Sequence, residues 1–158
     1  MSDAPPFFIG IGDPSRRDDG LGPWLAEALH RRGCNTAQVA RDGAALAALL
    51  DGHAAAILLD ATRGAGAPGT LTWLDLGQAR LPVGLSPLST HIVGLAEGVE
   101  ILRALEALPP RLLFVGIEGA AFDHAAGLTP AVEVVAETLL PRLEALLSDS
   151  ANWADTRG

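Results

Sequence analysis

Continuous apolar runs mark the strands that the chain is expected to form. Three such runs, Pro6–Ile11, His53–Asp60 and Arg111–Glu118, are typical of strands that are buried on both faces of a sheet. Weaker strand patterns occupy Asn35–Arg41 and Thr70–Leu76. The pattern therefore predicts a sheet of about five strands.

Helical periodicity fills much of the chain between these runs. Leu21, Leu25 and Leu29 fall on one face of a helix that is predicted over Asp19–Arg32. Pro141 lies inside the last helical pattern, which it is expected to kink or break. The other predicted helices are Gly43–Leu50, one that begins at Ser89-Thr90-His91 and ends near Leu108, and a last one that begins at the cap Thr129-Pro130.

Alternating strands and helices favour an α/β fold, a three-layer sandwich with helices on both faces of a mostly parallel twisted sheet. The loop Thr62–Gly69 is too short for a helical crossover, so the strands on either side of it are antiparallel if they are neighbours. We therefore expect one antiparallel strand. A single domain is predicted over residues 1–158, with a core at about 6–147 and a polar tail at 148–158.

The composition of the chain limits the classes of molecule that it is expected to bind. The formal net charge is −8 and there is no lysine, which argues against nucleic acid or an anionic membrane as the main partner. The first six residues do not resemble a signal peptide, and no apolar run approaches the ~18 residues that span a bilayer. We expect a cytoplasmic monomer. Cys34 is the only cysteine, and we interpret it as a small buried thiol.

Polar residues that stand where elements begin or end are the candidates for chemistry. Asp19 opens the first helix, Asp60 closes a buried strand, and His91 opens a later helix. Two oxygen ligands and one nitrogen ligand suit a divalent transition metal, and the same groups suit proton transfer. Each also has a plainer explanation, because carboxylates cap helices and loops. A G-x-S-x-G elbow is absent, and the glycine pattern at Gly10 supports dinucleotide binding only weakly.

Five blocks in order resemble the hydrogenase maturation endopeptidases. The first is GIGDPSRRDDGLG, which is similar to the opening G-x-G-N-x-x-x-x-D-[DE]-x-x-G of that family. The others are ILLDA at Ile57–Ala61, STHIVGLAEGVEIL at Ser89–Leu102, VGIEG at Val115–Gly119 and GLTPAVE at Gly127–Glu133. The resemblance covers about residues 7 to 147.

The resemblance implies a nickel-dependent endopeptidase of aspartic type. Such an enzyme removes a C-terminal extension from the large-subunit precursor of a nickel–iron hydrogenase. By motif position, Asp19, Asp60 and His91 are expected to contact the metal, and Asp19 and Asp60 to be catalytic. The nickel belongs to the precursor and is bound transiently, so no stored cofactor is expected.

Two departures from the family pattern lie in the first block. Asp13 replaces the usual Asn, and Arg17 replaces the usual Gly before the acid pair. These changes keep open a second hypothesis, a non-catalytic module that docks nickel-loaded precursor. A third hypothesis is a small-molecule hydrolase or phosphorylase on a related scaffold, which would not need nickel.

Overall fold

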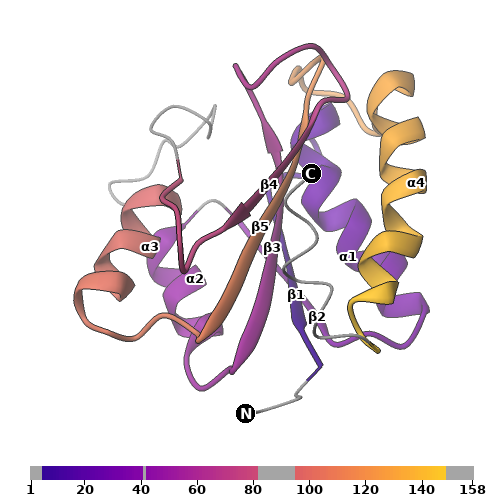
Figure 1. The fold of residues 1–158 in the computed structure, drawn as a ribbon. Helices are drawn as coiled ribbons and strands as arrows, with labels where there is room; N and C mark the ends of the chain where they lie inside the picture. Colours follow the sequence, from indigo (N-terminus) through magenta and orange to yellow (C-terminus); the bar gives the residue numbers. More distant parts are fainter. Residues whose placement is uncertain (1–4, 41, 82–94, 149–158) are drawn as a thin grey trace.

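A five-stranded sheet forms the centre of the computed structural model, which describes residues 5–40, 42–81 and 95–148 (Figure 1). The strand order is β2-β1-β3-β5-β4. The strands are β1 (Phe7–Ile11), β2 (Thr36–Val39), β3 (Ala55–Thr62), β4 (Leu71–Asp75) and β5 (Arg111–Glu118).

Four strands are parallel and β4 is antiparallel to its neighbour, which confirms the predicted mixed sheet. The partner of β4 is β5 and not β3, because β5 lies between them. The two strands that flank the loop Thr62–Gly69 are therefore not neighbours. Burial explains the order: β5 is buried along almost its whole length and suits the interior, whereas β4 is half-exposed throughout and suits an edge.

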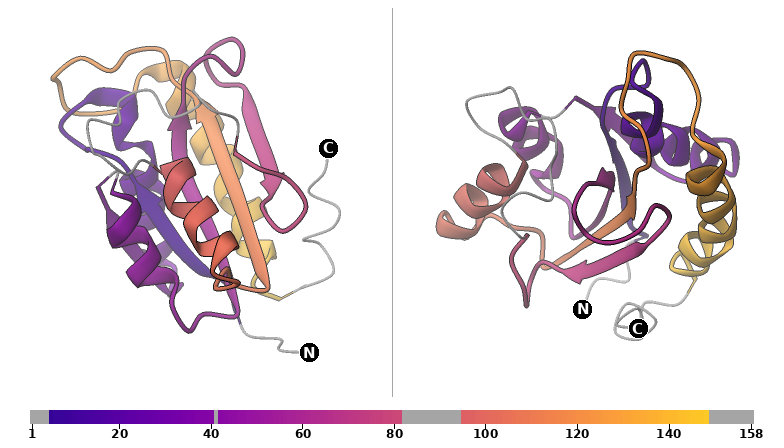
Figure 2. Two further views of the ribbon diagram at one scale, coloured as in Figure 1. Left: turned by 90° about the vertical axis from the view of Figure 1, so that its left-hand side faces the viewer. Right: turned by 90° about the horizontal axis from the view of Figure 1, so that it is seen from above.

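Helices cover both faces of the sheet and make the three predicted layers (Figure 2). Helices α1 and α4 lie on one face, and α2 and α3 lie on the other (Figure 1). The helical elements are η1, a 3-10 turn (Arg17–Gly20), α1 (Leu21–Arg31), α2 (Gly43–Leu50), α3 (Leu95–Ala104) and α4 (Pro130–Ala145).

Each face of the sheet has its own apolar core. Along β3, Ile57 and Leu59 pack in the cluster that contains residues of α1 and α4. Leu58 packs in the other cluster, with residues of α2 and α3. Because side chains alternate along a strand, Asp60 projects to the same face as Leu58, the one covered by α2 and α3.

Two predicted helix features differ from the structure. The first helix does not begin at Asp19, because Arg17–Gly20 form a 3-10 turn and α1 starts only at Leu21. The second feature is Pro141, which was expected to kink or break the last helix: α4 does not break there and continues to Ala145. Pro141 is exposed, and so is Glu137 one turn earlier, so water can bond the carbonyl that a proline leaves without a donor.

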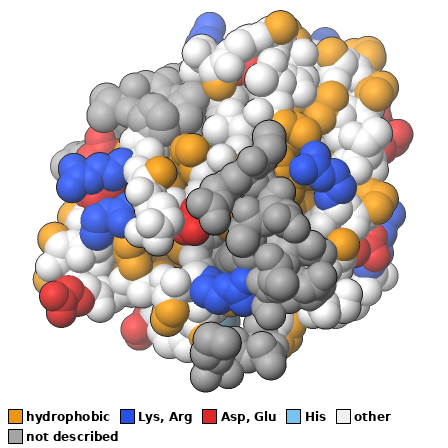
Figure 3. Space-filling model, viewed as in Figure 1, with side chains coloured by type: hydrophobic (Ala, Val, Ile, Leu, Met, Phe, Trp, Pro, Cys, Tyr) orange, Lys and Arg blue, Asp and Glu red, His pale blue; other side chains and the backbone are white. Residues whose placement is uncertain are grey.

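Positive and negative side chains are interspersed on the surface of the molecule. On the face shown in Figure 3, the described arginine side chains form small separate groups with carboxylates between them. Within that face, no broad basic surface of the kind that nucleic acids require is seen among the described residues. No helix in the described ranges is long and apolar enough to cross a bilayer.

Candidate active site

The loops that follow β1, β3 and β5 come together at one edge of the sheet, at the top of Figure 1. These three strands are parallel neighbours, so their carboxyl ends face the same way. Sites in open α/β sheets form at this edge. The residues after β1 form a tight segment, Asp13–Gly20, that we call the acidic turn.

The acidic turn folds back onto the glycine that precedes it. Gly12 has φ +139°, and a Cβ at this position would overlap the backbone carbonyl of Asp19. Gly22 similarly lies against the carbonyl of Leu59 and the backbone of Ile11, where no side chain would fit. These close approaches seat the acidic turn and the start of α1 directly on β1 and β3.

Asp19 is held inside this turn. Only 3% of the residue is exposed, and its Oδ2 accepts a hydrogen bond of 3.0 Å from the backbone N–H of Asp13. The N-cap of α1 is Gly20, and the helix has no side-chain cap. Capping of α1 therefore does not account for Asp19.

Asp60 lies on β3 at the same edge. It is 1% exposed and stands opposite Gly116 of β5. The strand runs two residues further than predicted, to Thr62, so Asp60 lies within the strand and not at its end. Because η1 contacts β3 and Gly22 touches Leu59, the structure places Asp19 and Asp60 on neighbouring elements at one edge.

His91 lies outside the described residues, so its approach to the two carboxylates stays a prediction. Within the described ranges, no group of three or more histidine, cysteine, aspartate or glutamate side chains could hold a metal ion. The role of Asp19 and Asp60 as metal ligands therefore also stays a prediction.

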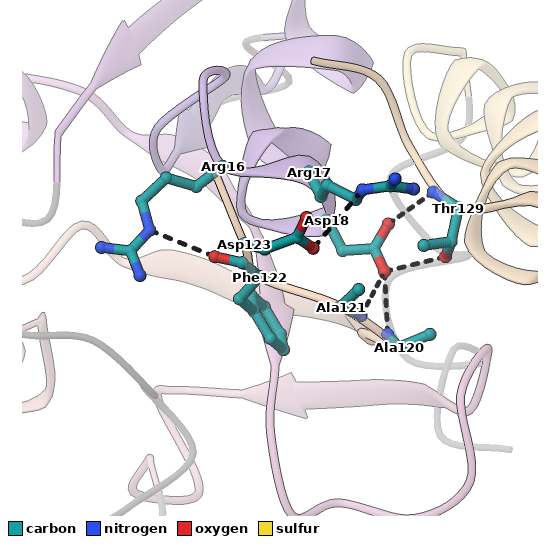
Figure 4. A network of polar contacts seen from close by, with 8 residues as sticks. All are labelled: Arg16, Arg17, Asp18, Ala120, Ala121, Phe122, Asp123 and Thr129. Carbon is teal, nitrogen blue, oxygen red and sulfur yellow. Dashed lines mark hydrogen bonds and ion pairs between the residues drawn. The ribbon is translucent and has the colours of Figure 1, made fainter. Parts of the chain in front are cut away.

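Asp18, next to the candidate residue Asp19, has a role that the sequence did not indicate. Its carboxylate is completely buried and accepts four hydrogen bonds (Figure 4). Oδ2 accepts from the N–H groups of Ala120 and Ala121 at 2.8 and 3.1 Å, and from the hydroxyl of Thr129 at 2.8 Å. Oδ1 accepts from the N–H of Thr129 at 2.8 Å. Asp18 therefore fastens the acidic turn to the β5–α4 loop.

Further contacts join the same two segments. The N–H of Arg17 donates to the carbonyl of Ala125 at 2.8 Å, and the N–H of Asp18 donates to that of Ala121 at 3.1 Å. Arg17 also forms an ion pair with Asp123, with 3.4 Å between Nε and Oδ1 (Figure 4). No local sequence pattern could reveal these contacts, because the joined segments are about a hundred residues apart.

Thr129 occupies the predicted N-cap position of α4, and Pro130 is the first helical residue. The side chain of Thr129 makes no capping bond to the helix; its hydroxyl donates to Asp18. The sequence therefore identified the boundary and missed the partner of the side chain. The hydroxyl donates to a charged acceptor, and such bonds are stronger than those between neutral groups.

The two departures from the family pattern have local explanations. Oδ1 of Asp13 accepts from the N–H and the hydroxyl of Ser15, and these bonds lower the pKa of Asp13 with a smaller contribution from Arg16. An asparagine could accept the same two bonds through its own oxygen. Arg17 has φ +45°, a backbone conformation that favours glycine, the residue usual there in the family that the sequence resembles.

Cys34 lies at the opposite edge of the sheet from the acidic turn, just before β2 begins. The residue is 6% exposed, which confirms the buried thiol. Burial raises the pKa of this thiol, and the Glu144 carboxylate raises it further. At neutral pH the thiol stays protonated, and only a thiolate is an effective nucleophile.

We therefore expect Cys34→Ser to keep the endopeptidase activity that the resemblance implies within about twofold of wild type, since no reacting group is removed. A modest loss of stability is expected, because a hydroxyl replaces a thiol in an apolar site. Cys34→Ala controls for that polarity. The measurement is the initial rate of precursor cleavage beside a thermal melt. Loss of cleavage in a variant that melts normally would show that the thiol takes part in the reaction.

Comparison with known proteins shows what this arrangement is similar to. The profile of the family described as hydrogenase maturation protease matches residues 41–145. Hydrogenase 2 maturation protease of Escherichia coli (strain K12) is 30% identical over 151 residues, with 91% of each chain covered.

Solved structures agree with that match. The hydrogenase maturating endopeptidase HybD from E. coli aligns with a TM-score of 0.76 at 25% identity, covering 94% of each chain. The [NiFe] hydrogenase maturation protease HybD from Thermococcus kodakarensis aligns with a TM-score of 0.70, covering 91% of this chain and 99% of that one. The second structure, at 21% identity, shows a shared fold.

Proposed function

The chain belongs to the hydrogenase maturation proteases and is an endopeptidase of hydrogenase maturation, and we propose that its substrate is a nickel–iron hydrogenase large-subunit precursor. We further propose that it removes the C-terminal extension of this precursor after nickel has been inserted. The observation that supports the proposal is the pair of buried carboxylates, Asp19 and Asp60, at the carboxyl edge of the sheet. We expect the enzyme to act as a monomer in the cytoplasm.

The nickel is part of the substrate in this proposal. Asp19 and Asp60 supply two negative oxygen ligands, and His91 supplies a neutral nitrogen ligand, so the set suits a divalent ion. The acidic turn is held rigidly through Asp18, so Asp19 would meet the metal without reorganising. Contact with a metal that only a loaded precursor carries makes cleavage conditional on nickel insertion.

Hydrolysis of the peptide bond needs water to attack the scissile carbonyl and the amine of the leaving segment to gain a proton. In one route, Asp19 or Asp60 acts as a general base: it accepts the proton of the attacking water and then donates it to the amine of the leaving segment. In the other, the substrate's nickel polarises the carbonyl or the water, and the carboxylates hold that nickel in place. Both routes require ionised carboxylates at the carboxyl edge.

The test compares nickel-loaded and nickel-free precursor as substrates. We expect the loaded form to lose mass by one cut near its C-terminus, while the nickel-free form stays intact. Mass spectrometry of both reactions measures the outcome. A loaded precursor that binds but keeps its mass would support the docking module instead. Cleavage of both forms at equal rates would remove nickel from the proposal.

A further inference from the structure

A cleft of about 520 Å³ lies at the same edge of the sheet as the acidic turn. Three loops form it, and each follows a different strand: Arg16 comes from the loop after β1, Arg63 to Pro68 from the loop after β3, and Glu118 to Asp123 from the end of β5 and its loop. We call it the arginine cleft, after Arg16 and Arg63.

Phe122 holds both arginines of the cleft. Cζ of Arg63 lies 5.5 Å from the centre of the Phe122 ring, a cation–π arrangement. Nε of Arg16 donates to the backbone carbonyl of Phe122 at 3.3 Å (Figure 4). The ring itself lies against Gly119, where a Cβ would overlap it. The two guanidinium groups are thus placed by one residue of the β5–α4 loop.

The carboxylates that line the arginine cleft are already engaged. Glu118 is 4% exposed and accepts bonds from the hydroxyl of Thr62 and the N–H groups of Gly64 and Ala65, at 2.8 to 3.0 Å. Asp123 pairs with Arg17. Within the described part of the chain, Arg16 and Arg63 have no ion pair.

Two arginines and two carboxylates line the cleft, so their formal charges balance, but only the arginines keep hydrogen-bonding groups without an ion-pair partner among the described residues. Arg16 also lies near the carboxylate of Asp13, which is exposed and accepts hydrogen bonds from Ser15. The chain as a whole carries a net charge of −8, so two unpaired arginines in one cleft are a local exception. Guanidinium groups with free N–H donors bind carboxylates through paired hydrogen bonds, which makes a carboxylate the fitting ligand.

We propose that the arginine cleft binds a carboxylate of the precursor segment that the enzyme removes. This inference rests on the proposed function. The body of the precursor keeps the nickel and is held at Asp19 and Asp60, whereas the removed segment must dissociate after the cut. Ion pairs of an exposed arginine such as Arg63 are weak and screened by salt, which suits a product that has to leave.

The carboxylate can come from an acidic side chain of the segment or from its C-terminus, and substrate variants separate the two sources. One precursor has every Asp and Glu beyond the scissile bond changed to the amide. Another has its C-terminus moved away by an added Gly-Ser stretch. The first change raises KM if a side chain binds the cleft, and the second raises KM if the terminus binds it.

The enzyme variants are Arg63→Gln and the double variant with Arg16→Gln. We expect KM for nickel-loaded precursor to rise about fivefold in the single variant and about tenfold or more in the double variant, with kcat within twofold. Added salt should raise the KM of wild type and change that of the double variant much less. Arg63→Lys, which keeps the charge, should recover part of the loss.

Arg31→Gln is the matched control, because Arg31 is an exposed arginine of α1 outside the cleft. Its KM should equal that of wild type. Arg16→Gln removes a hydrogen bond to the β5–α4 loop, so the double variant could lose stability as well as affinity. If its melting temperature falls, the KM of Arg63→Gln alone tests the inference, because Arg63 is exposed. An unchanged KM in Arg63→Gln with wild-type cleavage intact overturns this inference alone. Absence of cleavage by wild type would instead count against the proposed function.

Discussion

Asp19→Asn is expected to abolish most precursor cleavage while leaving the protein folded. The amide oxygen can still accept the hydrogen bond that the N–H of Asp13 donates to Oδ2, so the acidic turn should keep its shape. The charge that a divalent ion needs is lost, and so is the capacity to take a proton. We expect the rate to fall by at least about tenfold, as is usual when a metal ligand or a general base is removed.

The measurement is the rate of cleavage of nickel-loaded precursor, read on a gel, beside a thermal melt of the same variant. Asp51→Asn is the control, because Asp51 is an exposed carboxylate just after α2, at the opposite edge of the sheet. That variant should cleave normally. If Asp19→Asn also cleaves at the wild-type rate and melts normally, Asp19 is not part of the site, and the case for Asp60 and His91 weakens.

Asp18→Asn, in contrast to Asp19→Asn, should mainly lower the stability of the fold. The Asp18 carboxylate accepts three bonds on Oδ2 and one on Oδ1, all from N–H or O–H donors. An asparagine would place its own NH₂ against at least one of these donors, because only one of its two terminal atoms accepts. With the residue fully buried, we expect the free energy of unfolding to fall by about 1–3 kcal/mol.

Urea unfolding followed by circular dichroism measures this change. Asp42→Asn is the matched control: one oxygen of Asp42 caps α2 by accepting from the N–H groups of Ala44 and Ala45, and an amide oxygen can do the same. Asp42→Asn should lower the free energy of unfolding by less than about 0.5 kcal/mol. A loss below about 1 kcal/mol in Asp18→Asn would show that the β5–α4 loop does not depend on this carboxylate.

The difference between these neighbours was invisible in the sequence, where Asp18 and Asp19 form one acidic pair. The resemblance to the maturation endopeptidases implied a metal contact for the second acid and left the first without a role. The structure assigns the first acid to the β5–α4 loop, where its partners Ala120 and Thr129 lie far along the chain. Hydrogen bonds between distant segments leave no periodic signal, so reading the pattern cannot find them.

The apolar pattern by itself determined which segments become strands and helices. Buried strands need continuous apolar runs and covering helices need apolar stripes, so Arg111–Glu118 and Gly43–Leu50 were predicted with their observed bounds. Only the tertiary structure decided that β5 separates β3 from β4, because strand order depends on how well each strand tolerates burial on both sides. It also decided that the Asp18 carboxylate joins the acidic turn to the β5–α4 loop, because its hydrogen-bond donors reach Asp18 only after the chain has folded.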